Sequence, residues 1–225
     1  MRLGLHITIA AIASVLFAAS AWAMFVESNA YVIGGDSSVA RLANWTSDPV
    51  QPGWSIATQN QNLLDCSDVL ASPNSLTMRF LDDATRAAIP QVCLTMADAI
   101  TQAAPAASYA WYVGAAAAVA TGDTAGFNHR LLRSQLTGAN EQWIAEVRAA
   151  LAEEHFAALT QDVTAQHALD LRMLVLSARG IRSIALNYAI NPAFRDRIIA
   201  IVETLPANDQ RRFLSQVRTA LSGAR

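Results

Sequence analysis

The sequence predicts an all-α protein, in which an N-terminal apolar helix is followed by a stack of antiparallel helical hairpins. Three observations support this class. Alanine is abundant and β-branched runs are short, which favours helix over strand. Beyond residue 58, apolar residues recur at helical spacing. Glycines or prolines lie in most of the connections between these periodic segments, where they end helices: Pro73, Pro105, Gly122, Gly138, Gly180, Pro192 and Pro206.

The N-terminal segment has the length and composition of a membrane helix. From Leu3 to Val26 no residue carries a formal charge except His6 when it is protonated. A helix of that length extends about 36 Å, enough to cross a bilayer. Arg2 precedes the apolar run and acidic residues follow it, so the positive-inside tendency places the N-terminus in the cytoplasm. We therefore expect residues 3–26 to lie in the bacterial inner membrane, with the rest in the periplasm.

A cleaved signal peptide is the alternative for residues 1–27. Ala21-Trp22-Ala23 has the small-x-small pattern that a signal peptidase accepts, so cleavage near Ala23 would release a periplasmic protein. The apolar run continues past that point through Val26, which favours a retained single-pass anchor. Both alternatives export the C-terminal domain.

Residues 28–57 have the composition of turns, with Gly34-Gly35, Ser37-Ser38 and Pro52-Gly53, and are predicted to be a linker with short ordered pieces. Trp45 and Trp54 either sit at the membrane interface or pack onto the helical domain.

Residues 58–225 are predicted to form the α-helical domain. Pro90 should kink or split the second of its helices, because a proline inside a helix removes a hydrogen bond and clashes with the preceding turn. The predicted helices cover residues 59–70, 75–103, 108–120, 124–136, 141–159, 162–178, 181–190, 193–205 and 209–221.

Two of these helices have predicted apolar stripes. In the helix over 141–159 the stripe contains Trp143, Ile144, Val147, Ala150 and Leu151. In the helix over 162–178 it contains Ala165, Leu169, Met173 and Leu176.

The segment from Pro105 to Gly122 (PAASYAWYVGAAAAVATG), followed by Asp123 and a helix with Phe127, resembles the helical hairpin of tetratricopeptide-repeat proteins. The resemblance covers one hairpin, without a regular 34-residue period elsewhere. More broadly, the apolar leader, two cysteines and the run from Asn128 to Arg148 (NHRLLRSQLTGANEQWIAEVR) resemble small membrane-anchored tetratricopeptide-like proteins of bacterial surface-polysaccharide assembly. That resemblance implies a scaffold or accessory role in the cell envelope.

Cys66 and Cys93 are the two cysteines of the chain. An even number of cysteines in an oxidising compartment predicts a disulfide, and this spacing should stabilise the fold by roughly 3 to 4 kcal/mol. Two separate buried thiols are the alternative.

The sequence predicts no catalytic residue, no cofactor and no metal site. All 16 cationic residues are arginine, so chemistry that requires a lysine is excluded. His129, His155 and His167 lie outside metal-binding spacings, and Glu153-Glu154-His155 is predicted to be a solvated helix face. An enzyme is the less favoured function; the alternative is a periplasmic enzyme that acts on glycans at a site formed only in the folded state.

Charge is distributed unevenly along the exported part. Residues 24–168 contain 6 arginines and 14 acidic residues, whereas residues 169–225 contain 9 arginines and 4 acidic residues. The basic third is predicted to bind a protein partner, an anionic glycan or a lipid phosphate, or else to balance the acidic part of its own domain. Export argues against nucleic acid. The candidate partner-binding residues are Tyr112, Trp143, Arg172, Arg179, Arg182, Arg195, Arg197, Arg211 and Arg212.

Overall fold

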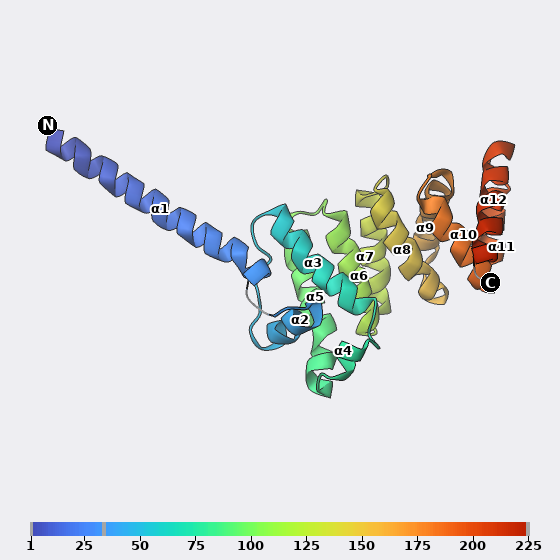
Figure 1. Ribbon diagram of the computed structural model, residues 1–225, viewed down its shortest axis with the longest axis horizontal. Helices are drawn as coiled ribbons and strands as arrows, with labels where there is room; N and C mark the ends of the chain where they lie inside the picture. The colour runs from blue at the N-terminus through green and yellow to red at the C-terminus, as the bar shows by residue number, and fades with distance from the viewer. Residues whose placement is uncertain (1, 33–34, 224–225) are drawn as a thin grey trace. The chain divides into compact units, whose positions relative to one another are not determined.

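The structure, a computed structural model, describes residues 2–32 and 35–223. This part of the chain folds into twelve α-helices and one short 3-10 helix and contains no strand (Figure 1). The all-α prediction is confirmed at this level. The helices divide into two compact units, Met1–Ile100 and Thr101–Arg225, with the division in the last turn of α5.

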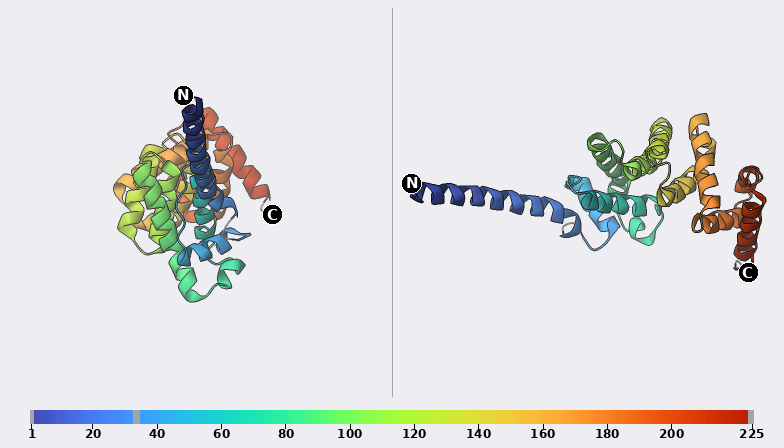
Figure 2. Two further views of the ribbon diagram at one scale, coloured as in Figure 1. Left: turned by 90° about the vertical axis from the view of Figure 1, so that its left-hand side faces the viewer. Right: turned by 90° about the horizontal axis from the view of Figure 1, so that it is seen from above.

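The N-terminal helix α1 (Arg2–Val32) is long and apolar enough to cross a membrane, as predicted. Its candidate span, His6–Ser28, has a mean hydropathy of 2.2, and none of its apolar window is buried by other elements. The large apolar side chains between Ile7 and Phe25 are 55–77% exposed. Figures 1 and 2 show α1 as one continuous helix. An apolar surface of this length would be costly to leave in water and is stable in a bilayer.

The predicted linker contains a helix. Residues Ser38–Ser47 form α2, which packs on α3 (Ile56–Leu70). Ser37 caps α2, because its hydroxyl accepts a hydrogen bond from the backbone N–H of Ala40 at 3.2 Å. Leu42 and Trp45, three residues apart on one face, are 0% and 2% exposed. Burial of this pair stabilises a helix that the turn-like composition concealed, and it places Trp45 in the core of the unit.

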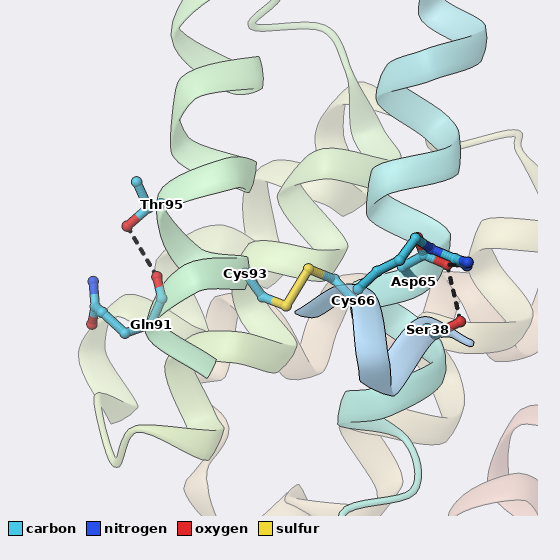
Figure 3. Close-up of a disulfide and its surroundings, with 7 residues drawn as sticks. Ser38, Asp65, Cys66, Gln91, Cys93 and Thr95 are labelled. Atoms are coloured by element: carbon cyan, nitrogen blue, oxygen red, sulfur yellow. Dashed lines mark hydrogen bonds and ion pairs between the residues drawn. A yellow bond between two sulfur atoms is a disulfide. The ribbon is translucent and has the colours of Figure 1, made fainter. Parts of the chain in front are cut away.

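The disulfide joins α3 to α5 (Asp83–Ala103). Cys66 and Cys93 are both 0% exposed, and their Cα atoms lie 5.6 Å apart, within the range that disulfides require (Figure 3). Beside Cys66, the Asp65 carboxylate accepts hydrogen bonds from Ser38 at 2.9 Å and from Arg41 at 2.6 Å. α2, α3 and α5 are thus held together by one covalent bond and one partly buried ion pair.

The helix predicted over 75–103 divides at residues 80–82 and is not split at Pro90, which lies inside α5. The first piece is the single turn α4 (Leu76–Arg79). Asp82 supplies the new helix start, because its carboxylate accepts hydrogen bonds from the Thr85 backbone N–H at 2.9 Å and hydroxyl at 2.7 Å. These hydrogen bonds lower the pKa of Asp82. A strong N-cap at residue 82 therefore sets the helix boundary, and α5 continues through Pro90.

The C-terminal end of α1 is fixed to the start of α3 by Glu27. One carboxylate oxygen accepts hydrogen bonds from the backbone N–H groups of Trp54 at 2.5 Å and Ser55 at 2.9 Å. The other accepts from the hydroxyls of Ser55 at 2.5 Å and Thr58 at 2.6 Å. A carboxylate at a helix N-terminus satisfies unpaired N–H groups and interacts favourably with the helix dipole. Glu27 therefore acts as a latch between α1 and α3.

We expect Glu27→Ala to destabilise the N-terminal unit and to raise hydrogen exchange at the start of α3, because several N–H and O–H donors there lose their acceptor. Hydrogen exchange of the 54–60 backbone, followed by mass spectrometry on the full chain in detergent, measures the loss. Asp36→Ala removes an exposed acid of the same unit and serves as the control. Equal protection in the two variants would contradict the latch.

The C-terminal unit consists of α6 (Ser108–Ala120), α7 (Thr124–Thr137), α8 (Gln142–Glu154), the 3-10 turn Phe156–Ala158, α9 (Gln161–Leu176), α10 (Gly180–Ile190), α11 (Pro192–Val202) and α12 (Ala207–Gly223). α6 and α7 make the most extensive helix pair, joined by a turn in which Gly122 has a φ of +81°. Glycine adopts this left-handed conformation without the steric cost of a Cβ. α8 packs on α9, and α10 packs on α12.

The two predicted apolar stripes do not match the buried faces. In α8 the buried residues are Ile144, Ala145, Arg148, Ala149 and Ala152, so only Ile144 of the predicted stripe is buried. In α9 they are Val163, His167, Asp170, Leu171, Leu174 and Val175, and none belongs to the predicted stripe. Both faces of α9 carry apolar side chains, and the inward face also carries two polar residues whose pairs fix it there. Asp170 pairs with Arg148 and His167 pairs with Glu153.

Candidate functional site

The outward face of α9 carries an apolar stripe. Leu169 is 57% exposed and Leu176 is 39% exposed, and Met173 lies between them, partly buried against the core of the unit. These side chains line a hollow of about 430 Å³ together with the α7–α8 connection at Ala139 and Asn140. Apolar side chains gathered along one helix face, with a concave surface beside them, are typical of protein interaction sites.

Arg172 places a positive charge inside this stripe. It lines the same hollow, and the hydrogen bond that its side chain makes is to the Thr204 hydroxyl, at 3.3 Å. Its charge is therefore not neutralised by an acidic neighbour in that contact. Arginine flanked by leucines presents both an apolar surface and a bidentate anion donor. We refer to Leu169, Arg172, Met173 and Leu176 as the α9 face.

The two aromatic residues predicted for partner binding differ in exposure. Tyr112 is buried, 6% exposed, and its ring stacks on Tyr109 with 5.8 Å between ring centroids. The structure therefore places Tyr112 in the core of the α6–α7 hairpin rather than on a binding surface. Trp143 is 46% exposed, and its ring packs at a tilt against the Tyr109 ring, with 4.9 Å between ring centroids. Trp143 remains accessible to a partner.

The other six predicted arginines divide into two groups. Arg195 and Arg212 hydrogen-bond to the C-terminal ends of other helices. Arg195 donates to the carbonyls of Tyr188 and Ala189 at the end of α10, and Arg212 donates to those of Val175 and Leu176 at the end of α9. A cation at a helix C-terminus satisfies its last carbonyls and interacts favourably with the dipole. The other four differ in their surroundings. Arg197 forms an ion pair with Glu153, and Arg179, whose side chain is 70% exposed, forms one with Glu146 at 3.4 Å. Arg182 and Arg211 are exposed.

A second hollow, of about 320 Å³, lies among α8, α9, α10 and Asn191 at the start of α11. Its floor is apolar, and its polar lining is formed by Glu146, Glu153, Glu154, Ser183, Asn187 and Asn191. Three carboxylates make this cavity unsuitable for the anionic glycan or lipid phosphate that the charge distribution suggested.

Glu153 is the buried centre of a charged cluster, and the prediction that its segment forms a solvated helix face is wrong for this residue. Its side chain is 5% exposed and accepts hydrogen bonds from His167 Nε2 at 2.7 Å and from Arg197. The Arg197 guanidinium also lies over the Phe156 ring, 3.9 Å from its centroid. Desolvation would raise the pKa of Glu153, but the hydrogen bonds and charges of His167 and Arg197 outweigh it and lower the pKa below 4.5.

This pKa shift predicts acid sensitivity of the C-terminal unit. Because the pKa of Glu153 is lower in the folded chain than its ordinary 4.5, ionised Glu153 contributes stability that is complete above pH 4.5. That contribution is lost as the pH falls through the lower folded-state value. We expect Glu153→Gln to be less stable than the wild type at pH 7. Between pH 5 and pH 3 the variant should lose less stability than the wild type, because it lacks the contribution of ionised Glu153. Urea unfolding followed by circular dichroism at both pH values measures this, with Glu154→Gln as the exposed control.

Metal binding has no candidate ligands in the described part of the chain, where no group of three or more His, Cys, Asp or Glu side chains is positioned to hold an ion. His167 hydrogen-bonds to Glu153 and is not among the residues that line the hollow of about 320 Å³. His155 packs against the Phe127 ring, and His129 against the Trp111 ring.

Two of the residues that organise this unit gave no signal in the sequence. Glu153 and His167 are 14 residues apart on different elements, so no local spacing reveals their contact. Arg148 does carry a signal, because it lies four residues after Ile144 and four before Ala152 on the buried face of α8. A charge in an apolar stripe predicts a buried partner. No family model, curated protein or solved structure matches the chain.

Proposed function

We propose that this protein is a membrane-anchored scaffold of the bacterial envelope, whose C-terminal helical unit binds a protein partner through the α9 face. The observation that carries the proposal is that Leu169 and Leu176 lie on the surface, on either side of Arg172, beside a concave hollow. A soluble helix commonly turns its leucines inward, so an apolar stripe that stays outside points to a partner. Arg172 favours a partner that presents a carboxylate beside an apolar residue.

The anchor and the compartment belong to the same proposal. α1 has the length and composition of a bilayer span, and the Cys66–Cys93 bond suits an oxidising compartment such as the periplasm. A role in surface-polysaccharide assembly follows from the resemblance to membrane-anchored tetratricopeptide-like proteins. One feature of the fold supports that likeness: α6 begins at residue 108 and α8 at residue 142, a spacing equal to the tetratricopeptide period of about 34 residues. α10 begins at residue 180, later than a constant period would place it.

Site-specific photo-crosslinking in the native bacterium tests the partner. A photoreactive phenylalanine analogue replaces Leu169 or Leu176, and Leu186 on α10, which is 50% exposed and outside the hollow, serves as the control. We expect one discrete adduct from the two α9 positions, absent with Leu186 and lost in Arg172→Glu. Equal adducts from all three positions would contradict a defined site. Altered surface-polysaccharide length in a deletion strain, restored by the wild type and not by Arg172→Glu, would support the envelope role.

An envelope hydrolase acting on glycans is the second candidate, because Glu153 pairs with a histidine and lines a cavity that also holds Glu146 and Glu154. The electrostatics favour it less. A general acid needs a raised pKa, whereas the pKa of Glu153 is lowered and both its oxygens already accept hydrogen bonds. Glycan hydrolysis by the purified chain that disappears in Glu153→Gln and in Glu146→Gln would favour the enzyme over the scaffold.

A further inference from the structure

A third hollow lies in the N-terminal unit, between the loop after α2 and the outer side of α5. It encloses about 350 Å³, near the lower end of the range that small-molecule pockets occupy. Trp45, Pro49 and Pro52 line one wall, and Val92 and Met96 line the other. Figure 3 shows Gln91 and Thr95 on the side of α5 that faces away from the disulfide, so this wall is held in place from behind by the Cys66–Cys93 bond.

Among the residues that the structure describes, no charged side chain lines this pocket. Its two hydroxyl groups are occupied by their own helices: Thr95 donates to the Gln91 carbonyl at 2.9 Å, and Thr46 donates to the Ala43 carbonyl at 2.7 Å. The polar groups left to meet a ligand are the amides of Gln51 and Gln91, both on exposed residues at the rim. An apolar interior with amides at its mouth fits a hydrocarbon chain attached to an uncharged polar group.

The same loop that forms one wall also contacts α1. Pro52 lines the pocket, and Trp54, two residues later, donates its backbone N–H to Glu27. Two peptide units span at most about 7.6 Å, so Pro52 in the wall of the pocket lies within that distance of the residue that hydrogen-bonds to Glu27 of α1. Two further hydrogen bonds fix the loop, from Asn62 to the Pro52 carbonyl at 3.3 Å and from Gln59 to the Gly53 carbonyl at 3.2 Å.

Exposed side chains next to the latch match a membrane interface. Trp54 is 66% exposed and Ile56 is 75% exposed, and both adjoin Ser55, whose hydroxyl hydrogen-bonds to Glu27. Tryptophan concentrates at the headgroup level of bilayers because its ring is apolar and its N–H polar. With α1 in the membrane, the hydrogen bonds of Glu27 to Trp54, Ser55 and Thr58 hold this edge of the unit close to the lipid surface.

We propose that the pocket binds one hydrocarbon chain of a bilayer lipid, drawn out beside α1. The inference rests on the proposed membrane anchoring of α1 and adds a ligand site that anchoring alone does not require. A lipid chain is the occupant because the pocket is uncharged inside and opens in a unit that the latch keeps next to lipid. Burial of the chain in the pocket is driven by removal of apolar surface from water.

A photoreactive phospholipid tests the site. The full-length chain is reconstituted in phosphatidylcholine vesicles that contain a phospholipid with a diazirine in one acyl chain, irradiated, digested and mapped by mass spectrometry. We expect adducts in the 6–28 region of α1 and a second set on α5 at Val92 and Met96. Ala88→Phe places a large side chain in the pocket and should remove the α5 adducts while leaving those on α1. Ala87→Phe, on the exposed side of α5, is the matched control and should leave both sets.

The outcomes separate the pocket from the anchor. Labelling of α1 without α5, or α5 labelling that persists in Ala88→Phe, overturns the pocket and leaves the anchor standing. Labelling of α5 without α1 supports the pocket and overturns the anchor, and labelling of neither overturns both. Ala99→Phe fills the pocket from another turn of α5 and replaces Ala88→Phe if that variant does not form its disulfide.

Discussion

Arg148→Met is expected to destabilise the C-terminal unit by about 3–5 kcal/mol, the cost of leaving a buried charge without its partner. Arg148 is 0% exposed, and its guanidinium donates to the Asp170 carboxylate through Nε at 2.9 Å and Nη2 at 2.6 Å. It also donates to the carbonyls of Ser134, at 3.0 Å, and Gly138, at 3.2 Å, which end α7. One side chain therefore connects α7, α8 and α9. Removing it leaves the buried Asp170 carboxylate without its partner, whereas the Ser134 and Gly138 carbonyls keep the backbone N–H groups of Gly138 and Glu141 as donors.

Hydrogen exchange of the α8 and α9 amides, followed by mass spectrometry, measures this loss within the C-terminal unit alone. Arg182→Met, which removes an exposed arginine from α10, is the control and should change exchange by less than about 0.5 kcal/mol. The double variant Arg148→Met with Asp170→Leu should recover part of the loss, because no charge is then left buried. Recovery stays partial, since the Ser134 and Gly138 carbonyls lose the charged donor that they share with backbone N–H groups. A double variant as unstable as the sum of the two single variants would refute the coupling.

The same ion pair explains where sequence-based prediction failed. α9 carries apolar side chains on two faces, and periodicity alone assigns the wrong one to the core. The choice between the faces depends on Asp170 and His167, whose partners Arg148 and Glu153 lie on another helix. A single sequence does not reveal such contacts. The stripe left outside contains Leu169, Met173 and Leu176 of the α9 face, which we propose as the partner-binding surface.

Other features depend on local signals and were predictable. The apolar run of α1 and the helix after Asp123 were predicted, and in the structure Asp123 caps α7 through its side chain. The cysteine pair also predicted its disulfide from number and compartment alone. α2 was missed because ten residues among glycine, serine and proline give a weak signal, and its stability depends on burial of Leu42 and Trp45.

The double variant Cys66→Ala with Cys93→Ala should lose about 3–4 kcal/mol, because the bond closes a loop of about 28 residues in the unfolded chain. Both cysteines are fully buried, and the loop contains α4 and the start of α5. The loss should therefore appear in α3 and α5 and spare α8 and α9. Hydrogen exchange on the full chain distinguishes the two units, and the same samples report the thiols by alkylation with and without reductant.

The proposed lipid pocket gives the double variant a second expected effect, on the α5 photo-adducts. Cys93 and Val92 are adjacent on α5, so loss of the bond frees the wall that Val92 and Met96 form. In phosphatidylcholine vesicles, the alanine double variant should therefore lose the α5 photo-adducts together with the exchange protection of α5, whereas the α1 adducts stay. Alkylation of wild-type cysteines without reductant would show that the bond is not formed in the native protein. Retained α5 protection in the double variant would show that the α2 and α3 contacts, through Trp45 and the Arg41–Asp65 ion pair, hold α5 without the disulfide.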